Sequence, residues 1–303
     1  MMPPKFITNS LMSAMAAKMT AKMEHAVLHT EGCALHYWHC GHGPTLITFV
    51  PGGNGHGLQF LALMAALADT GKYTCATFDR RQMSASVVTD GVNKKFNPPQ
   101  QARDIRAVIS VLGFAQSIIF GSSSGGILSL QFAHDFPDMV IHLISHEAPT
   151  FILLPDAAEL FEWFHGLMTL YETKGLEAAA AEFESKLTGY DDEGIPTCVS
   201  PDPKNRVNFW ENEIPILIGG YVSNLWRVKE NGTSVGVMRG VRCKDAFFAR
   251  ATVEQAKILG CPLAVVPGHH QGFEVETEAF LPAFLEMIET LEKRKKGSAI
   301  STY

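Results

Sequence analysis

The sequence predicts an α/β fold in which a mostly parallel, eight-stranded sheet is flanked by helices. Short runs of apolar and β-branched residues alternate with segments of helical apolar spacing, which is typical of a parallel sheet with right-handed crossovers. One of these runs leads through a glycine-rich turn directly into a helix. With 303 residues, 46% of them hydrophobic and 18% charged, the chain is long enough for one large core with an insertion.

The expected elements follow in chain order. The first three strands are predicted to form a β-meander that opens onto the α/β body, and a helix is also expected between the last two strands. Strands are predicted at residues 26–28, 34–38, 46–50, 73–78, 117–120, 140–145, 235–238 and 263–266, and helices at 58–67, 99–112 and 276–295. This assigns residues 1–24 to an N-terminal extension, 25–152 and 232–295 to the core, and 296–303 to a flexible tail.

The alternation of strands and helices stops between residues 153 and 231. That stretch has helical spacing and many large apolar side chains, interrupted by a polar loop at residues 190–204. We interpret it as a helical cap inserted after the sixth strand. A cap at this point would cover a site at the carboxyl edge of the sheet.

The turn after the fifth strand has the pattern G-x-S-x-G. Gly121 and Gly125 stand two residues before and after Ser123. A strand-turn-helix of this kind raises the serine hydroxyl above the sheet, so Ser123 is the predicted nucleophile. The competing interpretation is a phosphate-binding glycine loop, but the spacing fits neither G-x-G-x-x-G nor a P-loop, and no lysine follows.

A serine nucleophile needs a base and donors for the oxyanion. His269 and His270 directly follow the last strand, and we favour His270 as the base, with His269 as a structural neighbour. Gly53, in a glycine-rich loop after the third strand, and Ser124, at the start of the helix, are the predicted N–H donors.

The acid that would orient the base is the hardest residue to place. The usual position, the loop after the seventh strand, has no carboxylate at its start, and the nearby Asp245 is expected to cap the next helix. Glu147, in the loop after the sixth strand, can reach the same sheet edge. We therefore predict Glu147 as the acid and keep Asp245 as the alternative.

These residues together resemble the α/β-hydrolase family, in which serine, acid and histidine follow in this chain order. From about residue 25 onward the motifs are most similar to fungal zearalenone lactonases. The shared motifs are a Pro-x-Gly loop at residues 51–53, the elbow at 122–125, H-E-x-P-T at 146–150 and P-G-x-H at 267–270. The resemblance implies a catalytic triad of Ser123, Glu147 and His270, and it marks Gly53 and Ser124 as oxyanion donors.

The chain departs from those lactonases at two positions. Leu217 stands where a cap tryptophan contacts substrate, and Gln82 stands where the relatives prefer glycine. We therefore expect a serine hydrolase that opens an apolar, aromatic lactone or ester of zearalenone type through an acyl-enzyme. Candidate substrate contacts are Asn54, His56, Trp163, Leu217 and Tyr221.

Two other functional classes remain open at this point. One is a small-molecule binding or receptor protein built on a hydrolase scaffold. The other is a C–C bond hydrolase or acyltransferase that uses the same triad. Sequence does not separate these reactions, because the scaffold is shared and the cap selects the substrate.

Composition limits the partners. A net charge of −6 and a pI near 6.1, with scattered Lys and Arg, indicate no nucleic-acid partner. No segment has the ~18 apolar residues needed to span a membrane. Six cysteines without a C-x-x-C pair suggest free thiols in the cytoplasm, and His39, Cys40 and His42 are not expected to bind metal. We expect no cofactor, a small-molecule substrate as partner, and leave a homodimer open.

Overall fold

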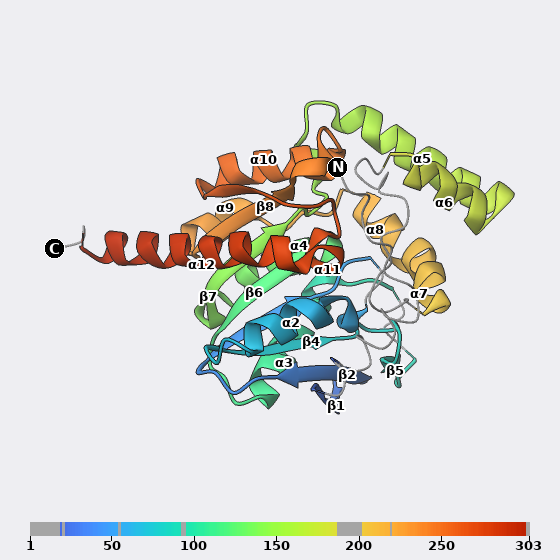
Figure 1. Ribbon diagram of the computed structural model, residues 1–303. Helices are drawn as coiled ribbons and strands as arrows, with labels where there is room; N and C mark the ends of the chain where they lie inside the picture. The colour runs from blue at the N-terminus through green and yellow to red at the C-terminus, as the bar shows by residue number, and fades with distance from the viewer. Residues whose placement is uncertain are drawn as a thin grey trace, which may run out of the picture.

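The chain folds around one central sheet (Figure 1). The computed structural model describes Met19 and residues 22–53, 56–91, 95–186, 202–218 and 220–300. The strands lie in the order β1-β2-β4-β3-β6-β7-β8-β9, and β5 pairs with β2. They are β1 Glu24–Thr30, β2 Cys33–Cys40, β3 Thr45–Val50, β4 Tyr73–Phe78, β5 Val87–Val88, β6 Ser117–Ser122, β7 Val140–His146, β8 Val235–Gly240 and β9 Leu263–Val266.

The sheet is mostly parallel, which confirms the predicted fold class. All neighbours from β4 through β3, β6, β7 and β8 to β9 pair in parallel, whereas β1 with β2 and β2 with β4 or β5 are antiparallel. Two details differ from the prediction. The described sheet has nine strands rather than eight, because the two-residue β5 was not expected. The meander is wrong as well, since β4 lies between β2 and β3 and pairs with both.

Helices cover both faces of the sheet and bury two separate apolar clusters. One face packs against α3, α4 and α9, and the other against α2 and α12. The strands between them are buried on both sides and therefore have almost continuous apolar sequences. The helices of the core are η1 Gly57–Phe60, α2 Leu61–Ala68, α3 Pro98–Val111, α4 Ser124–Asp135, η2 Pro137–Met139, η5 Val241–Cys243, α10 Phe247–Leu259, α11 Gly272–Val275 and α12 Thr277–Ile300.

Several predicted boundaries can be compared with these elements. The helix expected at residues 58–67 begins with a 3₁₀ turn, and α12 continues to Ile300, beyond the predicted end at 295. The helix therefore includes much of the stretch expected to be a flexible tail, and residues 301–303 lie outside the described residues. Of the N-terminal extension, only Met19 and residues 22–24 are described.

The segment between β7 and β8 is helical, with a third apolar cluster of its own. Its helices are η3 Phe151–Leu153, α5 Ala157–Lys174, α6 Leu176–Glu184, α7 Pro203–Asn208, the π-helical turn η4 Phe209–Glu213, α8 Ile214–Ile218 and α9 Leu225–Glu230. In Figure 1, α5 to α8 lie beyond one end of the sheet. In contrast, α9 packs against α4 and α10, so the last part of the predicted cap belongs to the core layer. Most of the predicted polar loop lies outside the described residues.

The parallel strands place five loops at one edge of the sheet. Their register pairs Val50 with Gly121, Ser122 with His146, and Gly240 with Val266, so the carboxyl ends of β3, β6, β7, β8 and β9 meet there. This is the edge at which open α/β sheets bind ligands. The segments that contain the predicted site residues all follow these strand ends.

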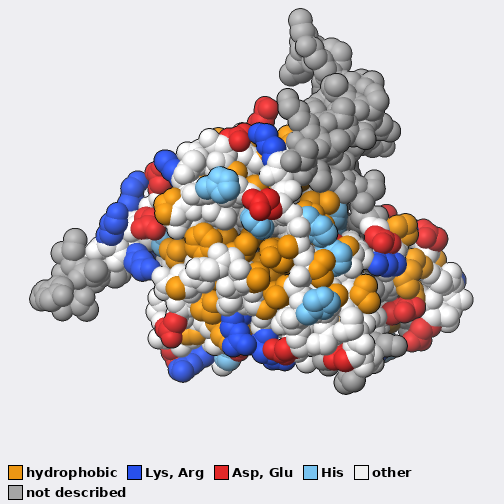
Figure 2. Space-filling model, turned by 90° about the horizontal axis from the view of Figure 1, so that it is seen from below, with side chains coloured by type: hydrophobic (Ala, Val, Ile, Leu, Met, Phe, Trp, Pro, Cys, Tyr) orange, Lys and Arg blue, Asp and Glu red, His pale blue; other side chains and the backbone are white. Residues whose placement is uncertain are grey.

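The far end of the sheet, at β1 and β5, has a different surface. Val27 and Val87 are exposed there, and Figure 2, which views the molecule from this side, shows histidine side chains among hydrophobic ones. His25 Nε2 lies 3.0 Å from His36 Nδ1, and its ring stacks on Trp38. The intervening β4 and β3 separate this surface from β6.

Among the helices whose residues the structure describes, none combines the length and the apolar character required to cross a membrane.

Candidate active site

Ser123 occupies a strained turn between β6 and α4. Its φ of 57° and ψ of −132° lie in a region that residues other than glycine rarely adopt. The backbone N–H of Ser123 donates to the carbonyl of His146 at 2.9 Å, which ties the turn to the end of β7. This geometry is that of a nucleophile elbow, which presents the hydroxyl above the sheet.

The two glycines of the pattern permit this turn because strand and helix approach each other closely. A Cβ atom on Gly121 would lie 2.2 Å from the carbonyl oxygen of Gly125, and one on Gly125 would lie 2.1 Å from the carbonyl oxygen of Val50. No real side chain fits at such distances. Glycine at both positions therefore permits the close approach of β6 and α4.

Glu147 and His270 meet beneath this turn. The Nδ1 atom of His270 lies 2.7 Å from Oε2 of Glu147. Two further groups donate to the same carboxylate: the backbone N–H of Gly240 to Oε1 at 2.8 Å, and the thiol of Cys243 to Oε2 at 3.2 Å. Glu147 is fully buried and has a φ of 47°, so the backbone is strained at this residue too.

The surroundings of Glu147 keep its carboxyl ionised. Burial raises the pKa of Glu147, but the hydrogen bond from His270, the nearby histidine rings and the Cys243 thiol outweigh burial and hold the pKa below its usual value. An ionised carboxylate only accepts hydrogen bonds, so Nδ1 of His270 carries a proton. In the neutral ring, Nε2 is then the nitrogen that can accept a proton.

The neighbouring candidates occupy other positions. His269 is buried and its Nδ1 accepts the backbone N–H of Gln271 at 2.9 Å, which stabilises the loop. Asp245 is exposed, and its backbone carbonyl accepts a hydrogen bond from Nε of Arg250 at 3.0 Å. The prediction that Asp245 caps the next helix is wrong, because the N-cap residue of α10 is Ala246 and no side chain caps this helix. Of the two carboxylates, Glu147 is the one that contacts His270.

The two predicted oxyanion donors lie near Ser123. Gly53 and Ser124 both line the same pocket as Ser123. A Cβ atom on Gly52 would lie 3.0 Å from Cβ of Ser123, so the loop after β3 passes close to the elbow. Bare backbone at this distance can present N–H groups to a substrate carbonyl.

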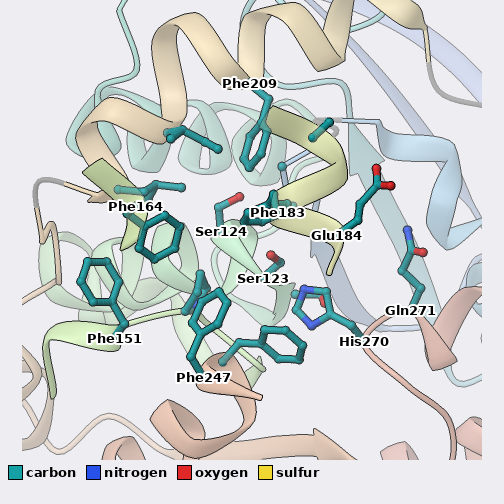
Figure 3. A pocket seen from close by; sticks show the side chains of 18 of the residues that line it. Ser123, Ser124, Phe151, Phe164, Phe183, Glu184, Phe209, Phe247, His270 and Gln271 are labelled. Atoms are coloured by element: carbon teal, nitrogen blue, oxygen red, sulfur yellow. The ribbon is translucent and has the colours of Figure 1, made fainter. Parts of the chain in front are cut away.

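These residues form the floor of a pocket of about 830 Å³. We define the floor as Gly52, Gly53, Ser122, Ser123, Ser124, His270 and Gln271, and the roof as the wall from the segment between β7 and β8. The roof consists of Pro149, Phe151, Phe164, Ala180, Phe183, Glu184, Ser185, Arg206, Phe209, Trp210, Ile214 and Leu217. Figure 3 shows Ser123 and His270 close together, with Phe151, Phe164 and Phe247 on one side and Glu184 and Gln271 on the other.

Of the predicted substrate contacts that the structure describes, only one lines this pocket. Leu217 is part of the roof. Trp163 lies behind the wall, where its indole N–H donates to Glu182 and its ring stacks on Phe183. Tyr221 instead donates its hydroxyl to the side chain of Gln131, and His56 is buried outside the lining. Asn54 lies outside the described residues.

Sequence reasoning missed several groups that shape the site. His146 is fully buried, its Nδ1 lies 3.0 Å from the hydroxyl of Ser122, and burial lowers its pKa to about 4. It therefore stays neutral beside His270. Cys243 contacts Glu147 from the loop where an acid was sought, and burial, with the nearby carboxylate, raises the pKa of its thiol. The sequence signal that could have revealed Cys243 is its position in the loop after β8, where the acid of such sites usually lies.

Comparison with known proteins agrees with this architecture. The family model described as alpha/beta hydrolase fold matches residues 45–221, which is more than half of the chain. An uncharacterized hydrolase of Bacillus subtilis (strain 168), YraK, is 25% identical over 278 residues, covering 90% of this chain and 98% of that protein. Epoxide hydrolase 1 of Caenorhabditis elegans is 33% identical over 78 residues, covering 26% of this chain and 19% of that protein.

A solved structure is also similar over nearly the whole chain. A Pseudomonas aeruginosa protein, provisionally identified as an epoxide hydrolase, superposes with a TM-score of 0.66 at 16% sequence identity, covering 89% of this chain and 97% of that one. At this level of identity the likeness shows the fold alone.

Proposed function

Because the chain belongs to the alpha/beta hydrolase fold family, we propose that it is a serine hydrolase that cleaves a mainly apolar, aromatic ester or lactone through an acyl-enzyme. The observation that carries this proposal is the contact between His270 and Glu147 beneath the strained turn of Ser123. Membership of the family supports a hydrolase. The choice of ester or lactone rests on the residues of the site.

In the proposed mechanism the floor performs the chemistry. Nε2 of His270 accepts the proton of the Ser123 hydroxyl as the oxygen attacks the substrate carbonyl. The N–H groups of Gly53 and Ser124 stabilise the oxyanion, and Glu147 holds the ring of His270 and stabilises its protonated form. His270 then gives the proton to the leaving alcohol, and water activated by the same histidine releases the acyl group.

The residue at the elbow argues against epoxide hydrolysis, the activity in the names of two of the similar proteins. Epoxide opening through a covalent intermediate requires a carboxylate nucleophile. In this chain Ser123 occupies the elbow, and the buried carboxylate of Glu147 is held by three donors. Ester or lactone cleavage is the reaction that a serine with a histidine and an acid supports.

The roof supports an apolar and partly aromatic substrate. Five of its side chains are aromatic, and Leu217 and Ile214 extend the apolar surface; the aromatic ones are Phe151, Phe164, Phe183, Phe209 and Trp210. A wall rich in aromatic side chains favours a ring system, and Glu184 and Arg206 are its charged members. A lactone of the zearalenone type, suggested by the sequence motifs, fits this description. Its ring opening would leave the alcohol and the acid on one molecule.

The test is hydrolysis by the purified protein with Ser123→Ala as the control. We would measure ring-opened acid from zearalenone by chromatography, and nitrophenol release from aryl esters of increasing acyl size. Turnover that is lost in Ser123→Ala supports the serine hydrolase, and opening of zearalenone supports the lactone. Turnover that survives in Ser123→Ala would overturn the mechanism. Hydrolysis of aryl esters without lactone opening would restrict the activity to esters.

A further inference from the structure

Two consecutive arginines after β4 form buried ion pairs, and one of these pairs reaches the candidate active site. Nη2 of Arg80 lies 2.6 Å from Oε2 of Glu213, and Nε of Arg81 lies 2.6 Å from Oδ2 of Asp104. All four side chains are almost completely buried. Asp104 lies on α3, within the core, whereas Glu213 ends the π-helical turn η4, next to the roof. The Arg80 pair therefore joins the core to the segment between β7 and β8.

Arg80 also holds the peptide that precedes Gly53. The same Nη2 atom donates to the carbonyl oxygen of Gly52 at 2.6 Å. This carbonyl and the N–H of Gly53 belong to one trans peptide, so they point in opposite directions. A guanidinium bound to the oxygen fixes the direction of the N–H and polarises it, because hydrogen bonds along a peptide strengthen one another.

Glu213 brings a negative charge close to the second oxyanion donor. Burial raises the pKa of Glu213, and the Arg80 guanidinium and the nearby Ser124 hydroxyl oppose that rise without cancelling it. An unpaired carboxylate at this position would repel an oxyanion forming between Gly53 and Ser124. Its ion pair with Arg80 offsets this repulsion and leaves the site without a net charge from the two groups.

We propose that Arg80 and Glu213 are a positioning pair that orients the oxyanion hole and couples it to the η4 turn of the roof. The inference rests on the proposed function and assigns no direct contact with substrate to either residue. Single π-helical turns are frequent at functional sites, and η4 presents both Phe209 and Trp210 to the pocket before it ends at Glu213. A roof that shifts on substrate binding would thus act on the oxyanion peptide through one ion pair.

The test uses a fluorophosphonate, which modifies a serine nucleophile without requiring the natural substrate to be known. The Ser123 oxygen would form a bond to phosphorus as its proton passes to Nε2 of His270 and fluoride leaves, with the charge on the phosphoryl oxygen held by the oxyanion hole. The second-order rate of labelling is followed by intact mass, and the labelled residue is identified by peptide mapping. For any nitrophenyl ester that is turned over, kcat and KM are measured in parallel.

Arg81→Met is the matched control, because it breaks a buried arginine–carboxylate pair that does not contact the floor. We expect Arg80→Met to slow labelling by about 10- to 100-fold and to lower kcat with little change in KM, since a misdirected donor acts mainly on the transition state. Arg80→Lys keeps the charge and should restore part of the rate. Arg81→Met should change labelling by less than about 3-fold if the protein stays folded.

Folding is checked for each variant by circular dichroism and thermal melting. If Arg80→Met does not fold, the double variant Arg80→Met with Glu213→Leu replaces the whole pair with apolar groups, which buried sites often tolerate. Slow labelling by that folded double variant supports the proposal. Equal labelling by the Arg80 and Arg81 variants would overturn it and leave the serine hydrolase intact. A wild-type protein that is not labelled at Ser123 would overturn both proposals together.

Discussion

The floor of the pocket comes from loops at the ends of β3, β6 and β9, whereas the roof comes from helices between β7 and β8. On the floor, backbone strain at Ser123 and close glycine contacts fix each group in place. The roof instead presents aromatic and aliphatic side chains from helices, and most of these side chains pack in a separate apolar cluster. Under the proposed function, the floor performs the chemistry and the roof binds the substrate. Substitutions on the floor should therefore alter kcat, and substitutions on the roof should alter KM.

The largest effect after loss of the nucleophile is expected at the carboxylate that holds His270. Glu147→Gln should lower kcat by about 10⁴-fold, because an amide no longer selects the required tautomer or stabilises the protonated ring. Asp245→Asn is the control and should change kcat by less than about 2-fold. Steady-state hydrolysis of an aryl ester measures both. A larger loss of kcat in Asp245→Asn would indicate that Asp245, rather than Glu147, is the acid of the triad.

The next effect concerns the stability of the floor at acid pH. Burial lowers the pKa of His146 from the ordinary 6.5 to about 4, so between these values the unfolded chain binds more protons than the folded one. Stability should therefore fall as the pH drops from 6.5 to 4, with a contribution from His146 of about 3 kcal/mol. In His146→Asn this contribution is absent. Urea unfolding of both proteins between pH 7 and pH 4 should show their stability difference shrinking; a constant difference would contradict the assignment.

A smaller effect is expected on the roof. Phe183→Ala should raise KM about 10-fold while kcat changes less, because a partly buried aromatic contact with substrate contributes roughly 1.4 kcal/mol. Phe161→Ala is the matched control, since Phe161 lies on neighbouring α5 but is exposed and does not line the pocket. Initial rates over a range of substrate concentrations separate the two constants. A fall in kcat at constant KM in Phe183→Ala would contradict the expectation that the roof acts on substrate binding.

The smallest effect is expected at Cys243. Its thiol donates to the Oε2 atom that also accepts from His270. Cys243→Ala should lower kcat by about 5-fold, the equivalent of one hydrogen bond of about 1 kcal/mol, whereas Cys243→Ser should stay within about 2-fold. The ratio of the two variants is the informative measurement. If alanine and serine behave alike, Cys243 serves packing rather than the orientation of Glu147.

The sequence by itself determined the fold class and the order of the elements around Ser123. Strands buried on both faces have continuous apolar runs, and a parallel sheet places all their carboxyl ends at one edge, so the loops that contain Glu147 and His270 could be expected there. The turn at the elbow could also be predicted from the local sequence, because glycines without Cβ atoms permit the close contact of strand and helix.

Tertiary structure alone decided which side chains face the pocket. Trp163 and Leu217 both lie in apolar helical segments of the predicted cap, yet only Leu217 lines the pocket, since the direction of a side chain depends on how its helix packs. Arg80 and Arg81 are adjacent in the chain, but one contacts Glu213 from η4 and the other Asp104 from α3. The two partners of these contacts are 133 and 23 positions apart in the chain. Such contacts cannot be predicted from local residue spacing, because they arise only when separate segments pack together.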